Sequence, residues 1–210
     1  MPENQILFEI MSTTRSMRRL KADPVPPALI RQILEAGTYA ANGGNMQSWR
    51  FLVIRDPAVK AEVGAYYRRA WHEHAGPRYR AGGPAPGTTP EAFGRMLSAV
   101  DYLADHFHEA PVWIVPCMMG GTQTRTTGSS IYPAVQNMLL AARALGLGAT
   151  LTTVHLLFEA ETERAMGLPE GAHSYAILPI GYPMGKFGPV RRTALSDVVY
   201  DDRWGVAWTE

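Results

Sequence analysis

The sequence has little cysteine, little net charge and no long apolar run, and each shortage excludes a class of protein. The single cysteine among 210 residues, Cys117, rules out an intramolecular disulfide and lies in an apolar run typical of a buried thiol. The 20 basic and 19 acidic side chains nearly cancel, which argues against nucleic-acid or membrane binding. No apolar run reaches membrane-spanning length, and residues 1–5 do not resemble a signal peptide. We therefore expect a cytoplasmic globular protein.

Several common catalytic and nucleotide-binding motifs are missing as well. Residues 146–150 lack the third glycine of a dinucleotide fingerprint and follow an expected helix, and no Walker loop occurs. There is no serine nucleophile elbow, and His155 is interpreted as structural or lid-facing and not as a general base. His72 and His74 would point roughly 200° apart on a helix, without a cysteine or carboxylate framework. The sequence therefore predicts no metal site and no catalytic side chain.

Hydrophobic periodicity predicts helices that alternate with single strands. The segment 23–27, rich in proline, is expected to end a short N-terminal helix. The expected helix at 132–145 is apolar around most of its circumference, with Pro133 in its first turn, so it should be buried nearly all round. No repeat or linker interrupts the chain, which favours one α+β domain over residues 1–210. The other expected helices are 28–36, 58–74, 92–108 and 158–166, and the expected strands are 51–54, 112–115, 149–154 and 176–180.

Residues 75–90 break this pattern. They are rich in glycine and proline, so we expect no regular element there. A loop of this length in a compact domain is typically a lid, a binding loop or a disordered patch. We interpret it as a candidate substrate lid.

A loop at residues 40–50 concentrates amide side chains and glycines between an expected helix and an expected strand. Asn42, Asn45 and Gln47 each offer a donor and an acceptor, while Gly43 and Gly44 let the backbone approach a ligand closely. This inventory suits a flat heterocycle that carries imide and carbonyl groups. The loop is therefore predicted to bind such a ligand.

Two short basic clusters lie near opposite ends of the chain. Arg15, Ser16 and Arg18 could surround a phosphate with charge-assisted hydrogen bonds, and Arg191 and Arg192 repeat the pattern. The alternative interpretation of both clusters is solvated surface charge.

Taken in order, these segments resemble the FMN-dependent nitroreductase family. The match runs through residues 14–20, 40–53, 131–153 and 179–204, and so covers the full length. The departures from the family pattern are Thr14, Leu20, Ala41, Asn42 and Ser48. Asn42 replaces a serine and keeps its hydrogen-bonding capacity. Residues 75–90 match nothing and lie where such proteins vary their substrate lid.

The resemblance implies a three-layer α/β/α fold with a central, mostly antiparallel sheet. It also implies an intertwined homodimer with two FMN sites at the subunit interface, and NADH or NADPH as electron donor. Gln136 and Asn137 match a buried helix of the family, and we favour an interface role for them over flavin contact.

The site residues that the resemblance implies fall into four groups. The basic cluster would hold the FMN phosphate and ribityl end, the C-terminal pair would close over it, and the amide loop would reach the flavin from the partner subunit. A fourth segment would lie beside the flavin N5 and C4 carbonyl, with the Thr153 hydroxyl near N5. The groups are Arg15, Ser16 and Arg18; Arg191 and Arg192; Asn42, Gly43 and Asn45; and Thr150, Leu151, Thr152 and Thr153.

The expected activity is hydride transfer from NAD(P)H to the flavin, followed by reduction of a nitroaromatic, a quinone or a similar electron-poor acceptor in a ping-pong sequence. Trp71 or Tyr79 would stack on the acceptor, or alternatively pack between helices. Two other functions stay open at this point. One is an FMN-dependent oxidase or dehydrogenase that desaturates a small metabolite, and the other is a non-catalytic flavin-binding protein.

Overall fold

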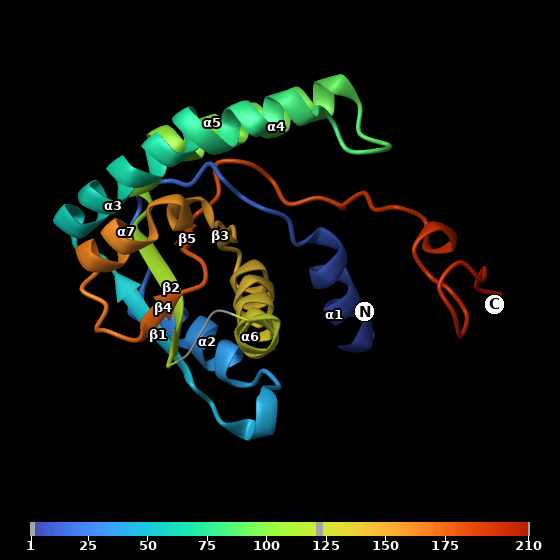
Figure 1. Cartoon of the computed structure of the whole chain (residues 1–210), viewed down its shortest axis with the longest axis horizontal. Coiled ribbons are helices and arrows are strands. Elements are labelled where there is room, and N and C mark those ends of the chain that lie inside the picture. Colours follow the sequence, from blue (N-terminus) through green and yellow to red (C-terminus); the bar gives the residue numbers. More distant parts are fainter. Residues whose placement is uncertain (1–2, 121–123, 210) are drawn as a thin grey trace.

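The computed structural model describes residues 3–120 and 124–209, and a sheet of five strands lies at its centre (Figure 1). Four strands lie side by side in the order β1, β2, β5, β3, and β4 pairs with the later part of β2. Every pairing among them is antiparallel. The strands are β1 (Trp49–Ile54), β2 (Val112–Met119), β3 (Gly148–Ala149), β4 (Ala172–Ser174) and β5 (Leu178–Gly181).

Helices cover both faces of the sheet. In Figure 1, α3 and α5 lie on one side of the strands, and α2 and α6 lie on the other. A π-helical turn, Ala70–Ala75, continues α3 towards α4. The helices are α1 (Glu3–Thr13), α2 (Pro27–Thr38), α3 (Pro57–Arg69), α4 (Gly76–Gly82), α5 (Pro90–Asp105), α6 (Arg125–Ala144) and α7 (Glu159–Ala165).

The alternation of side chains along β2 explains the three layers. Trp113 and Val115 are buried in a cluster with side chains of α3 and α5, whereas Val112 and Ile114 are buried with side chains of α2 and α6. A strand that is apolar on both faces needs cover on both faces. The predicted α+β class, the three layers and the antiparallel sheet are therefore confirmed. No helix within the described residues is long and apolar enough to cross a bilayer.

The ends of two helices differ from the sequence prediction. The first helix ends at Thr13, well before the proline-rich segment 23–27, because the backbone beyond it bonds to distant strands instead of to itself. Helix α6 begins at Arg125 and not near residue 132, because Thr124 and Thr127 form a reciprocal capping box. Pro133 therefore lies inside the helix.

Helix α6 is also less buried than its composition predicts. Ile131 and Met138 are fully buried against the sheet and α2, but Gln136 is exposed and Leu139 and Leu140 are only half-buried within one chain. The expectation of burial all round is therefore wrong for the isolated chain.

The segment 75–90 contains a helix that the sequence analysis did not predict. Helix α4 continues directly from the π-helical residues 70–75, so Pro77 lies within a continuous helical stretch just after that turn. Gly83, with φ of 69°, follows the helix, and the rest of the segment is irregular up to α5.

Candidate functional site

Main-chain hydrogen bonds bring three remote segments together. Residues 14–20 run extended beside β3, where the Met17 amide donates to the Ala149 carbonyl over 2.9 Å. The Met184 amide donates to the Arg19 carbonyl over 3.0 Å, and Val190 donates to Ser12 over 2.9 Å. The two basic clusters, which lie at opposite ends of the sequence, therefore meet beside β3.

Gly148 makes this close approach possible. A Cβ atom at this position would lie 2.9 Å from Met17 Cβ and 3.1 Å from Pro183 Cβ, both shorter than normal contacts. Only a residue without a side chain lets residues 14–20 lie this close to β3.

We expect Gly148→Ala to destabilise the fold by about 1–3 kcal/mol, because the new methyl group must push residues 14–20 away from β3. Gly94→Ala is the matched control, since nothing lies within 4 Å of a Cβ added there in α5. Urea unfolding measures both variants. Equal stability of Gly148→Ala and the parent protein would contradict the explanation.

The first cavity at this meeting point has a volume of about 220 Å³. The wall contributed by α6 includes Arg143, whose Nε donates to Thr13 Oγ1 over 3.0 Å and whose guanidinium lies 4.3 Å from the Phe187 ring centre. Arg143 thus ties α6 to the segments that carry both basic clusters. The lining residues that the sequence analysis had singled out are Arg15, Ser16, Gln136, Thr150 and Arg192.

A second cavity, of about 510 Å³, is lined by arginines and by no acidic residue. In a chain whose total charge is only +1, this convergence creates a local field suited to an anion such as phosphate. Arg95, on α5, belongs to neither basic cluster in the sequence and was missed by the sequence analysis. The arginines are Arg15, Arg18, Arg95, Arg191 and Arg192.

A third, smaller cavity of about 130 Å³ lies between residues 150–154 and a wall that includes Tyr67, Trp71 and Tyr79. The Tyr67 hydroxyl and Thr152 Oγ1 are 2.8 Å apart, and burial raises the pKa of Tyr67 to about 12, so this phenol stays neutral. Thr152 is buried and its hydroxyl is hydrogen-bonded to Tyr67, whereas Thr153 is exposed. Burial also lowers the pKa of Arg18, which still keeps its charge near neutral pH.

The three cavities share lining residues and so form one cleft. Arg15, Ser16 and Arg192 line the first and second, Thr150 lines the first and third, and Arg18 lines the second and third. The arginine-rich end therefore continues into the aromatic end. The structure brings together the basic cluster, the C-terminal arginines and residues 150–153.

The amide loop is not part of this cleft within one chain. Asn42 Oδ1 accepts a hydrogen bond from the Gln47 amide over 2.9 Å, and the Gly43 amide donates to Ser130 Oγ over 3.2 Å near the start of α6. Neither these residues nor Asn45 lines any of the three cavities.

The two amide side chains expected at an interface have different surroundings. The Asn137 side chain donates to the Ala36 carbonyl over 3.1 Å and so joins α6 to α2 within the chain. Gln136 lines the first cavity. The sequence analysis treated the two residues alike, but they face different sides of α6.

His155 is structural, as its sequence context indicated. Its side chain is fully buried, with Nε2 placed 3.2 Å from Ser174 Oγ, and burial lowers the pKa of His155 from 6.5 to about 3. Cys117 is also buried, and burial raises the pKa of its thiol to about 12. Neither side chain is therefore a candidate nucleophile or base.

The shift at His155 predicts a loss of stability in acid. Between pH 6.5 and about 3 the unfolded chain binds a proton that the folded chain does not, so stability falls as the pH falls through this window. The slope approaches about 1.4 kcal/mol for each pH unit. His155→Gln should give a shallower slope in urea unfolding at pH 7, 6 and 5. Parallel slopes for the two proteins would refute this assignment.

Comparison with known proteins agrees with this geometry. The family model described as "Nitroreductase family" matches residues 11–182. An NADH dehydrogenase of Thermus thermophilus is 32% identical over 198 residues, which cover 88% of this chain and 90% of that protein. A 5,6-dimethylbenzimidazole synthase of Rhodobacter capsulatus is 29% identical over 84% of this chain and 83% of its own length.

Among solved structures, oxidised iodotyrosine deiodinase bound to FMN and 3-iodo-L-tyrosine superimposes with a TM-score of 0.75. The match covers 94% of this chain and 100% of that one at 22% identity, so it supports the fold alone.

Proposed function

Because the chain belongs to the nitroreductase family, we propose that it is an FMN-dependent oxidoreductase that takes electrons from NADH or NADPH and reduces an electron-poor acceptor such as a nitroaromatic or a quinone. One observation carries the proposal. The arginines from both ends of the chain converge beside residues 150–153, in a cleft whose other end is aromatic.

The residues of the cleft fit FMN from end to end. Arg15, Ser16 and Arg192 would hold the phosphate, because they line both polar cavities and offer charged and hydroxyl donors. Residues 150–153 would lie along the edge of the ring system, at the start of the aromatic cavity. When bound, FMN supplies the redox chemistry that no side chain here can provide.

The roles of the individual side chains follow from this placement. Arg18 lies between the polar and aromatic ends of the cleft, so its positive charge would stabilise the negative charge of a reduced flavin ring. Thr153 keeps an exposed hydroxyl for contact near N5, whereas the hydroxyl of Thr152 is held by Tyr67. The protein thus binds and orients the flavin, and it needs no acid or base residue for the electron transfer.

A second copy of the chain completes the site in this proposal. The amide loop of Asn42, Gly43 and Asn45 stands outside the cleft of its own chain, where a partner's cleft can receive it. Figure 1 shows the C-terminal residues extending beyond α1, away from the sheet. Helix α1 and the C-terminal residues expose large apolar side chains, for example Phe8 at 69% and Trp204 at 88%, which an intertwined homodimer would cover.

The candidate lid would close the aromatic end. Tyr79, on α4 within residues 75–90, lines the third cavity and is 56% exposed. A planar acceptor would stack between Tyr79 and the flavin ring. We place the protein in the cytoplasm as one domain over residues 1–210, in keeping with its reduced, buried Cys117.

The test is the visible spectrum of the purified protein under anaerobic conditions during titration with NADH and then with NADPH. A yellow protein that bleaches rapidly with either nucleotide supports the reductase. Slow bleaching by both, with rapid bleaching by an organic substrate, would replace it by an oxidase or dehydrogenase. A yellow protein that nothing bleaches would indicate a binding protein, and failure to bind added FMN would overturn the assignment.

A mixed dimer tests the shared site. Suppose that each FMN site uses Arg15 of one chain and Asn42 of the other. In a heterodimer of one Arg15→Ala chain and one Asn42→Ala chain, one site then carries both changes and the other site carries neither. We expect such heterodimers to bind one FMN with the affinity of the parent protein. Two equally weakened sites would show that each chain builds its own site.

A further inference from the structure

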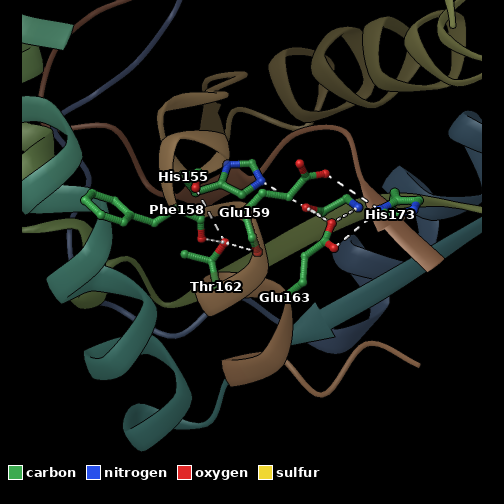
Figure 2. Close-up of polar contacts among 7 residues, drawn as sticks. His155, Phe158, Glu159, Thr162, Glu163 and His173 are labelled. Carbon is green, nitrogen blue, oxygen red and sulfur yellow. Dashed lines mark hydrogen bonds and ion pairs between the residues drawn. The ribbon is translucent and has the colours of Figure 1, made fainter. Parts of the chain in front are cut away.

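Two carboxylates and an imidazole converge at the junction of α7 and β4, apart from the cleft. Glu159 and Glu163 are four residues apart, so their side chains leave α7 on the same face. Figure 2 shows both reaching towards His173, which belongs to β4. One ligand atom from each of the three side chains lies within 4.8 Å of the other two.

The distances in this cluster are those of loose ion pairs, and they also match the spacing of ligands around a metal ion. His173 Nδ1 lies 3.6 Å from Glu159 Oε1 and 3.5 Å from Glu163 Oε2, whereas a charge-assisted N–H···O bond is about 2.7–2.9 Å long. Ligands of a tetrahedral ion with bonds near 2.1 Å stand about 3.4 Å apart. Within the described residues, Nδ1 is shielded from water and has no hydrogen-bond partner. A lone pair on this nitrogen would point at the space between the carboxylates.

A second layer of hydrogen bonds orients Glu163. Its Oε1 accepts from the backbone amide of Ser174 over 2.6 Å and from Ser174 Oγ over 2.9 Å, which leaves Oε2 directed at His173. The buried His155 lies against the same serine hydroxyl. Thr162 Oγ1 donates to the Phe158 and Glu159 carbonyls and so fixes the first turn of α7 (Figure 2). Outer partners of this kind commonly orient metal ligands.

We propose that Glu159, Glu163 and His173 bind one divalent ion of the zinc type, through one carboxylate oxygen of each glutamate and Nδ1 of His173, with water completing the coordination. The imidazole favours zinc over calcium or magnesium, which prefer oxygen ligands alone. The Cys117 thiol is not among the ligand atoms that converge within 4.8 Å of one another. The bound ion would link α7 to β4. The inference is independent of the proposed activity.

The experiment is titration calorimetry of the full-length protein with zinc chloride after treatment with a chelator and dialysis. We expect one zinc ion per chain, and at least tenfold weaker binding in Glu159→Gln and in His173→Gln. Glu161→Gln is the matched control, because position 161 lies on the same helix but roughly 200° away from positions 159 and 163. This variant should bind zinc like the parent protein. Thermal unfolding with and without zinc should show a rise in Tm in the parent and the control only.

Two results would overturn the proposal. One is the absence of zinc binding by the parent protein, which would leave His173 as an ordinary ion-pair partner of the glutamates. The other is equal zinc affinity in all four proteins, which would place the bound ion elsewhere. Both readouts are made without NADH, so they do not depend on turnover or on the reductase assignment.

Discussion

Arg15→Ala is expected to leave the protein folded but to lower its affinity for FMN roughly 100-fold. Arg15 is exposed and lines both polar cavities of the cleft, so its loss removes charge-assisted bonds to the phosphate without opening the core. Such bonds contribute about 1.5–3 kcal/mol each, and about 2.7 kcal/mol corresponds to 100-fold in affinity. Fluorescence titration of flavin-free protein measures the change.

Two further variants make this result specific. Arg31→Ala removes another exposed arginine, on α2, which lines none of the three cavities, and this variant should bind FMN like the parent protein. Arg15→Lys keeps the charge but loses the fork of two parallel donors, so its affinity should fall between the other two. If Arg15→Ala binds as tightly as Arg31→Ala, the phosphate is held elsewhere.

Trp71→Ala should cost about 3–5 kcal/mol of stability, the usual range for emptying a buried tryptophan site. Trp71 is 1% exposed, packs in the core with α3 and α5, and also lines the aromatic cavity. Its Nε1 donates to Asp101 Oδ1 over 2.7 Å. Burial alone would raise the pKa of Asp101, but hydrogen bonds from Trp71 and Arg80 outweigh it and hold that pKa low. The variant therefore also removes one of the two hydrogen bonds to the Asp101 carboxylate, which still pairs with Arg80 of α4.

Trp71→Phe separates packing from the hydrogen bond, and should recover most of the stability in urea unfolding while losing the Asp101 contact. Tyr39→Ala, which truncates a residue that is 80% exposed, should change stability by less than about 0.5 kcal/mol. A loss in Trp71→Ala no greater than that in Tyr39→Ala would show that the buried position is not critical. Trp71 packs between helices, as one of its two interpretations expected, and stacking on an acceptor stays a prediction.

Parts of the site that could be predicted from the sequence are those with dense local signals. Arg15, Ser16 and Arg18 stand close together in the sequence, whereas residues 150–153 were singled out only through the resemblance to the nitroreductase family. Arg95 and Tyr67 could not be found this way, because each is an ordinary helix residue until tertiary packing places it in the cleft. The cluster around His173 was missed for a related reason. Its glutamates have helical spacing, but only the pairing of β4 with β2 brings the histidine to them.

The fold shows the same division. β1 and β2 were predicted because continuous apolar runs indicate strands buried on both faces. The end of α1 was not predicted. The backbone of residues 14–20 forms hydrogen bonds with distant partners such as Ala149, which no local sequence pattern identifies. Helix α4 was missed because glycine and proline were weighed by composition, whereas the structure accommodates Pro77 directly after the π-helical turn, as it accommodates Pro133 inside α6.

The main-chain bonds that hold residues 14–20 also set a time at which the cofactor can bind during synthesis. Met17 and Lys21 bond to Ala149 and Tyr182, so the arginine-rich cleft has no walls while only the first half of the chain has left the ribosome. Lys21 and Tyr182 are 161 positions apart, so at about 5–20 residues per second Tyr182 is added roughly 8–32 seconds after Lys21. Loading of the flavin is therefore a late event, and a nascent chain carries its basic segment uncovered until the last strand arrives.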